Sequence, residues 1–88
     1  MKIKNGFILR NVANTHIVVP VAQNTLNYKG MLSLNESGAF LWGVLQKGTD
    51  KAGLLTALLN EYDVPEEIAA ADIDAFLTRV RQIGALEE

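Results

Sequence analysis

The sequence contains no cysteine and a single histidine, His16, among its 88 residues. Without cysteine the chain forms no disulfide, carries no thiol nucleophile and cannot assemble the Cys/His sets that hold structural zinc. No acid lies within the first 35 residues to orient His16 as a general base. We therefore interpret this histidine as a surface or hairpin residue and expect no metal site.

Other catalytic patterns are missing as well. Asp72 and Asp74 lie two positions apart, and on a helix such side chains diverge, so they do not form a carboxylate pair. The glycines follow none of the spacings that cradle a phosphate. Trp42 lies among apolar residues, which favours a place in the core over a role in stacking a ligand. We therefore predict that the chain is not an enzyme and uses no cofactor.

Long apolar runs are also absent. The run Phe7-Ile8-Leu9 ends at Arg10, which is too short for the core of a signal peptide, and no segment approaches the roughly 20 apolar residues of a membrane span. A chain of 88 residues has room for one core, so we expect a single domain over residues 1–88. Together with the absence of cysteine, these features favour a cytoplasmic protein that has no contact with a membrane.

Acidic residues are missing from the first 35 positions. That part has four bases and no acid, a net charge of +4, whereas residues 36–88 have four bases and ten acids, a net charge of −6. Two interpretations remain open: each half solvates its own surface, or the two halves border a polarised groove. The acidic balance of the second part argues against DNA binding, because binding to phosphates needs Lys and Arg.

The first third of the chain has the pattern of strands. Residues 6–13 alternate between two faces, and the β-branched residues of segment 17–21 fit a second strand. Asn14-Thr15 predicts a hairpin turn, and Pro20, which has no N–H, predicts that the second strand is not a fully paired centre of the sheet. A third, short strand is expected over residues 31–34.

The rest of the chain follows the period of helices. Asn35 is the expected N-cap of a first helix, with Ser33 as a competing cap two residues earlier. Asp50, or the threonine before it, caps a second helix, and Pro65 begins a third that closes at Gly84. Strands followed by helices predict an α+β fold, in which a small antiparallel three-stranded sheet carries three helices on one side.

The junction between the third strand and the first helix resembles a known family. The run Leu34-Asn35-Glu36-Ser37-Gly38-Ala39-Phe40-Leu41-Trp42 is similar to the most recognisable stretch of the PqqD-like family, the small peptide-binding domains of ribosomal-peptide biosynthesis also called precursor-recognition elements. Further residues look like the family pattern: Gly6-Phe7-Ile8-Leu9-Arg10, Gly48-Thr49, Leu58-Leu59, Tyr62, Asp72, Phe76-Leu77, Gly84 and Leu86. Ala85 departs from it, because the family usually has a bulky apolar residue at that place.

The resemblance implies a winged helix-turn-helix-like domain that binds the leader segment of a ribosomally made precursor peptide by β-strand addition. Such a domain presents the peptide to a modifying enzyme, often a radical-SAM protein. In the family the third strand is the edge that pairs with the peptide, and the third helix is the neighbouring wall. Carried onto this sequence, the resemblance implies peptide contacts by Tyr28, Met31, Leu32, Ser33, Leu34, Asp72, Ile73, Phe76, Arg79 and Val80.

Alternatives to this function and to these contacts remain open. The apolar residues of the third helix can equally belong to the core. A winged-helix domain can also bind DNA, and a structural module can pair its open strand edge with a second copy to form a homodimer. Among the partners we expect a leader peptide and a peptide-modifying enzyme, with no nucleic acid and no membrane.

Overall fold

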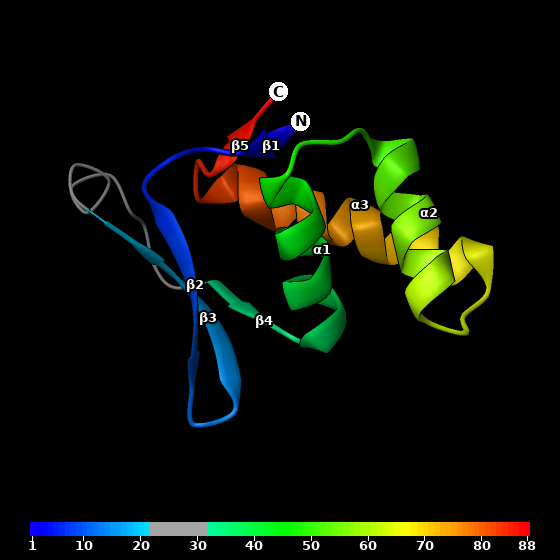
Figure 1. The fold of residues 1–88 in the computed structure, drawn as a ribbon, viewed down its shortest axis with the longest axis horizontal. Coiled ribbons are helices and arrows are strands. Elements are labelled where there is room, and N and C mark those ends of the chain that lie inside the picture. The colour runs from blue at the N-terminus through cyan, green and yellow to red at the C-terminus, as the bar shows by residue number, and fades with distance from the viewer. Residues whose placement is uncertain (22–31) are drawn as a thin grey trace.

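The computed structural model describes residues 1–21 and 32–88. The elements along the chain are β1 (Lys2–Ile3), β2 (Phe7–Val12), β3 (Thr15–Pro20), β4 (Leu32–Leu34), α1 (Glu36–Gln46), α2 (Lys51–Glu61), α3 (Glu66–Gln82) and β5 (Leu86–Glu87). Strands β2, β3 and β4 form an antiparallel sheet beside the three helices (Figure 1). The predicted α+β fold is confirmed, and a second, two-stranded sheet of β1 and β5 adds to it.

Strand β3 is the central strand of the larger sheet. Its residue Val18 pairs with Leu9 of β2 on one side and with Leu32 of β4 on the other, and Val18 is fully buried. Pro20 predicted that this strand is not a fully paired centre of the sheet. Strand β3 is the central strand, and its described pairing with β4 does not reach Pro20. Among the described residues, β4 pairs with residues 16–18, so Pro20 has no described partner in β4 and its missing N–H removes none of these bonds.

The turn between β2 and β3 lies one residue earlier than predicted. Ala13 and Asn14 are its two central residues, with φ of 51° and 65°, and Val12 pairs with Thr15 across the turn. Positive φ at both central residues matches the twist of a hairpin and is typical of Asn and Gly. The sequence cue at Asn14 was correct, but Ala13, which has a Cβ and disfavours this conformation, is the other turn residue.

Helix α1 begins immediately after β4. The Asn35 side chain between them accepts a hydrogen bond from the Gly38 backbone N–H at 2.8 Å, which confirms Asn35 over Ser33 as the N-cap. Helix α2 begins in the same way, because the Asp50 side chain accepts from the Gly53 N–H at 2.8 Å. The cap at Asn35 fixes the direction of α1 relative to the sheet edge from which it leaves.

The core lies between the sheet and the helices. It is made of apolar side chains from every element: Ile3, Phe7, Val18, Leu32, Leu34, Leu41, Trp42, Leu45, Leu54, Leu58, Ala69, Ile73, Phe76, Leu77, Val80, Ala85 and Leu86. Trp42 is fully buried, as predicted. It is the largest fully buried side chain among the described residues.

The C-terminal residues pair with the N-terminal residues. Gly84, with φ of 74°, ends α3, and the Ala85 N–H donates to the Val80 carbonyl at 3.1 Å, as in a Schellman cap. Ile3 of β1 pairs with Leu86 of β5, and both termini lie close together (Figure 1). Ala85, where the family pattern has a larger residue, is fully buried, and its carbonyl accepts a hydrogen bond from the Lys4 N–H at 2.8 Å.

Candidate functional site

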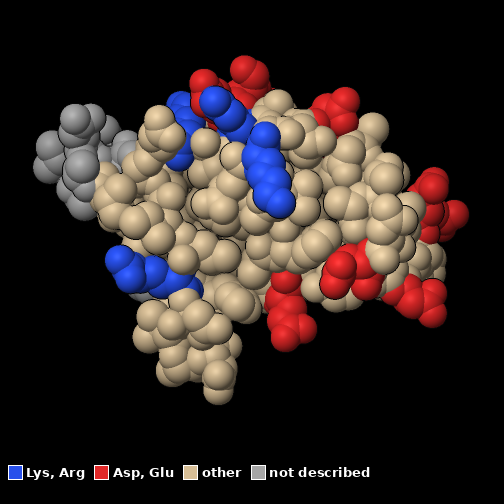
Figure 2. Space-filling view, viewed as in Figure 1, with Lys and Arg blue, Asp and Glu red and all other residues tan. Residues whose placement is uncertain are grey.

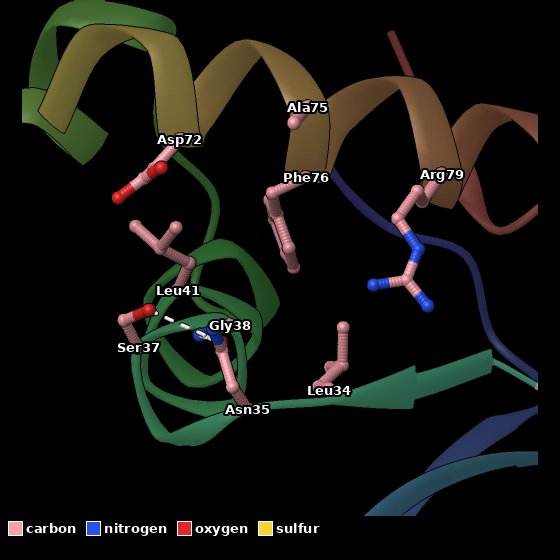
Figure 3. Close-up of a pocket in the computed structure, with 9 residues that line it drawn as sticks. All are labelled: Leu34, Asn35, Ser37, Gly38, Leu41, Asp72, Ala75, Phe76 and Arg79. Atoms are coloured by element: carbon pink, nitrogen blue, oxygen red, sulfur yellow. Dashed lines mark hydrogen bonds between the residues drawn. The ribbon is translucent and has the colours of Figure 1, made fainter. Parts of the chain in front are cut away.

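A groove lies between the β4–α1 junction and α3 (Figure 3). Its cavity measures about 130 Å³. We call it the β4–α3 groove and define it by its lining residues: Leu34, Asn35, Ser37, Gly38, Leu41, Asp72, Ala75, Phe76 and Arg79. One wall therefore comes from the strand edge and the first turns of α1, and the other from one face of α3.

The floor of the groove is apolar. Leu34 and Leu41 are almost fully buried, and the Phe76 ring closes the gap between them from the α3 side (Figure 3). Gly38 leaves this space open because it has no side chain. A Cβ at Gly38 would lie 3.2 Å from the Leu34 Cβ and 3.1 Å from the Asn35 Oδ1, closer than ordinary packing allows.

Two opposite charges lie at the ends of the groove. Asp72 and Arg79 are seven residues apart on α3, which places them on the same face about 10 Å apart along the helix axis. Both side chains point toward the groove from α3 (Figure 3). Both charged residues that line the groove therefore come from one helix, and no Lys or Arg of residues 1–21 lines it.

The charge asymmetry of the chain appears on the surface instead. Figure 2 shows Asp and Glu over the side where α2 and α3 lie, and further acids beside the Lys and Arg at the top of the view. Opposite charges also pair on this surface, as Lys2 does with Glu87 and Arg81 with Glu88.

Arg79 contacts the sheet edge directly. Its Nη2 donates a hydrogen bond to the backbone carbonyl of Ser33 at 2.7 Å, across 46 positions of sequence. Leu32 and Leu34 turn their side chains into the core, and the Ser33 side chain is exposed on the opposite face. The N–H and C=O of one residue in an antiparallel strand point to the same edge, so Ser33 presents both to the side of β4 away from β3.

The structure brings together part of the predicted contact set. Asp72, Phe76 and Arg79 line the groove together with Leu34, and Ser33 lies at its edge. Leu32 is on β4 as predicted, but its side chain is in the core. Ile73 and Val80 have no exposed surface at all, so the alternative of core packing describes where they lie. Tyr28 and Met31 lie outside the described residues.

Sequence reasoning did not assign five residues that line the groove: Asn35, Ser37, Gly38, Leu41 and Ala75. The first four belong to the run that carries the family resemblance, which was read as a structural junction. Ala75 could have been found from periodicity, because positions 72, 75, 76 and 79 follow the i, i+3, i+4, i+7 spacing of one helix face.

The groove continues beyond Asp72 into a second cavity of about 330 Å³. The two cavities share Asn35, Ser37 and Asp72. The remaining lining of the second cavity comes from the start of α1 and the region around the end of α2: Glu36, Leu58, Tyr62 and Val64. An extended ligand in the β4–α3 groove therefore has room to continue past the strand edge.

Within the described ranges, no three His, Asp or Glu side chains gather in a way that could hold a metal ion. No helix in the described ranges is long and apolar enough to cross a membrane. The pKa of Arg81 is raised and that of Glu88 is lowered, chiefly by the hydrogen bond between them, and neither residue lines the groove.

Comparison with known proteins places the chain in a recognised context. The family model described as "Coenzyme PQQ synthesis protein D (PqqD)" matches residues 23–86. No curated protein sequence matches the chain. Two solved structures share its fold: "TbiB1 in Complex with the TbiA(beta) Leader Peptide", with 20% identity and a TM-score of 0.75, and "Lasso peptide synthetase B1 complexed with the leader peptide", with 18% identity and a TM-score of 0.72. The likeness covers 99% of this chain in both, and 95% and 96% of the respective solved chains.

Proposed function

The chain belongs to the PqqD family, and on this premise we propose that it binds the leader segment of a ribosomally made precursor peptide and presents it to a modifying enzyme. The observation that carries the proposal is the edge of β4, where the Ser33 backbone faces an apolar groove that is walled by α3. Both solved structures of the same fold are, by their names, complexes with a leader peptide, which supports a ligand of this kind.

Binding would proceed by strand addition. An extended peptide placed beside β4 exchanges backbone hydrogen bonds with Ser33, and these bonds do not depend on the peptide's sequence. Side chains on one face of such a strand recur about every 6.6 Å. One of them can enter the apolar part of the groove between Leu34 and Phe76, while its neighbours on that face approach Asp72 or Arg79. The backbone thus supplies affinity and the α3 wall supplies selectivity.

This role is one of binding and not of catalysis. The chain would hold the peptide while a separate enzyme, a radical-SAM protein or another peptide-modifying enzyme, carries out the reaction. Ile73 and Val80 act in this scheme through the core that fixes α3, without touching the peptide, because both are fully buried.

Nothing in the described residues favours DNA binding. Helix α3, which would have to enter a groove of DNA, carries four acids against two bases: Glu66, Glu67, Asp72, Asp74, Arg79 and Arg81. Such a helix repels phosphates along most of its length. A homodimer through β4 would use the same edge as the peptide, so the two states would compete.

Titration of the ¹⁵N-labelled protein with the leader segment of a candidate precursor peptide tests the proposal. We expect the largest amide shifts in residues 32–38 and 72–79, with α2 (Lys51–Glu61) nearly unchanged. A scrambled leader of the same composition is the control. Largest shifts on α2, or equal shifts with the scrambled peptide, would contradict binding at the β4–α3 groove.

A further inference from the structure

We propose that Arg79 is a displaceable cover of the β4 edge and that it selects a carboxylate in the peptide that displaces it. This inference rests on the proposed function, because it concerns the same strand edge. It goes further by naming the class of leader that the groove accepts and by assigning Arg79 a different partner in the free and in the bound protein.

The first step is the position of the guanidinium. Arg79 Nη2 lies 2.7 Å from the Ser33 carbonyl oxygen, the acceptor that a peptide N–H would use in strand addition. The β3–β4 pairing matches Ile17 with Ser33, and β3 occupies the opposite edge of β4 at this point. In the free protein, Arg79 therefore takes the place of the incoming strand at this carbonyl.

The second step is the lack of a charged partner for Arg79. Within residues 1–21 and 32–88, Arg79 forms no ion pair with a carboxylate. Arg81, two positions along the same helix, donates instead to both carboxylate oxygens of Glu88, with its Nη2 2.9 Å from Oε1. A neutral carbonyl is the weaker of these two kinds of partner for a guanidinium, because a carboxylate carries the opposite charge and offers two oxygens for parallel hydrogen bonds.

The third step is the exchange of hydrogen-bond partners when a peptide binds. A peptide strand that takes the Ser33 carbonyl releases the guanidinium, and this loss opposes binding unless the peptide offers Arg79 another acceptor. A peptide carboxylate offers two oxygens in the planar arrangement that guanidinium matches. The contact between Arg79 and Ser33 is exposed, so the release itself is small, and the gain from a carboxylate outweighs it.

The strand geometry fixes where this carboxylate lies. The peptide residue opposite Ser33 turns its side chain to the exposed face, as Ser33 does, and the residues on either side of it face the helices, as Leu32 and Leu34 do. The one nearer Leu34 meets the apolar floor with Phe76, and the other remains beside Arg79. The leader should therefore carry an apolar residue and an Asp or Glu two positions apart.

An mRNA-displayed library of random nine-residue peptides tests this, selected in parallel on the wild type, Arg79→Ala and Arg81→Ala. We expect the wild type and Arg81→Ala to enrich peptides with an apolar residue and an acid two positions apart. Arg79→Ala should keep the apolar preference and lose the acidic one. Arg81 is the matched control, because it is an exposed arginine of the same helix that lies outside the groove.

Fluorescence anisotropy then measures the affinity for the peptide most enriched on the wild type and for its Glu→Gln form. These affinities distinguish the selection of a carboxylate by Arg79 from its covering of the β4 edge. The wild type should prefer the Glu form by about 3- to 30-fold, and Arg79→Ala should show almost no preference. If Arg79 covers the edge, Arg79→Ala should also bind the Gln form about 2- to 5-fold more tightly than the wild type does. Arg79→Lys, which keeps the charge and loses the planar fork, should retain part of the preference.

The outcomes distinguish this inference from the proposed function. Peptides that shift the amides of β4 but carry no acidic preference, or the same preference with Arg79→Ala, would overturn the role of Arg79 and leave the proposed function in place. If Arg79→Ala bound the Gln form more weakly than the wild type does, the claim that Arg79 covers the β4 edge would be wrong. Failure of the library to yield any peptide that shifts the amides of β4 would overturn both.

Discussion

Gly38, in the first turn of α1, packs so closely on Leu34 that a Cβ at position 38 would lie 3.2 Å from the Leu34 Cβ. Helix and strand meet at this point without an intervening side chain. The space so preserved is the floor of the β4–α3 groove. Glycine disfavours the helical conformation, but at position 38 its missing side chain lets α1 approach β4 closely and keeps the groove open.

A comparison of two glycine substitutions in α1 follows from this contact. At Gly43 nothing lies within 4 Å of an added Cβ, so Gly43→Ala should raise the free energy of unfolding by about 0.5–1 kcal/mol. Gly38→Ala raises the helix propensity by the same amount, but its Cβ crowds Leu34. The free energy of unfolding of Gly38→Ala should therefore be about 1–3 kcal/mol lower than that of Gly43→Ala. Urea denaturation measures both, and equal stabilities would mean that position 38 is not crowded.

Two isoleucines of α3 provide a test of the core. Ile73 is fully buried and Ile68 is 53% exposed. Ile73→Ala should therefore lower the free energy of unfolding by about 2–5 kcal/mol, whereas Ile68→Ala should change it by less than about 0.5 kcal/mol. Chemical denaturation checks the pair, and similar losses for both variants would show that α3 is rotated relative to the orientation described.

The hairpin turn offers a stabilising change. Ala13 has a φ of 51°, a conformation that disfavours residues with a Cβ, so Ala13→Gly should raise the free energy of unfolding by about 0.5–1 kcal/mol. Ala71 is exposed in the interior of α3, and Ala71→Gly should lower it by about 1 kcal/mol. Opposite signs in thermal or urea unfolding would support the turn at residues 13 and 14, whereas destabilisation by both substitutions would contradict it.

Two substitutions at Ser33 separate backbone from side-chain recognition. Ser33→Pro removes the N–H that faces the peptide and should abolish most leader binding, while Ser33→Ala keeps the N–H and should bind almost as well as the wild type. Isothermal titration with a bound leader peptide measures the affinities, and circular dichroism checks that both variants are folded. A large loss with Ser33→Ala would indicate that the hydroxyl, and not the backbone, is recognised.

The Arg81–Glu88 pair gives a pH dependence with a definite sign. The hydrogen bond from Arg81 lowers the pKa of Glu88 below its ordinary value of 4.5. The pair therefore contributes its full stability above pH 4.5 and loses that contribution as the pH falls through the lowered pKa. The difference in unfolding free energy between the wild type and Glu88→Gln should accordingly shrink between neutral and acid pH. A difference that grows on acidification would contradict this sign.

The sequence was sufficient for the elements whose cause is local. Asn35 caps α1 and Gly84 ends α3 because short-range hydrogen bonds and a positive φ decide both ends. Ala13 escaped notice in the turn because the strand pairing imposes its conformation against its own preference. Pro20 indicated that β3 is incompletely paired, but the central place of β3 depends on the order of the strands, which no local pattern encodes.

The site was predictable to the extent that it follows the period of α3. Asp72, Phe76 and Arg79 share a helix face, and the structure places them on one wall. Periodicity alone could not separate Phe76, at the border of the core and the groove, from Ile73 and Val80, which are fully buried. The contact between Arg79 and Ser33 depends on tertiary packing across 46 positions, which no local pattern encodes.

The pairing of Ile3 with Leu86 has a consequence for how this domain can be joined to other proteins. It brings both ends of the chain to one place, beside a separate hollow lined by Met1, Lys2, Gly48, Thr49, Asp50, Glu87 and Glu88 that shares no residue with the β4–α3 groove. A linker attached at either end therefore starts from the same point and leaves the groove open. The same fold can thus serve as a free-standing subunit, as the first module of a fusion or as its last.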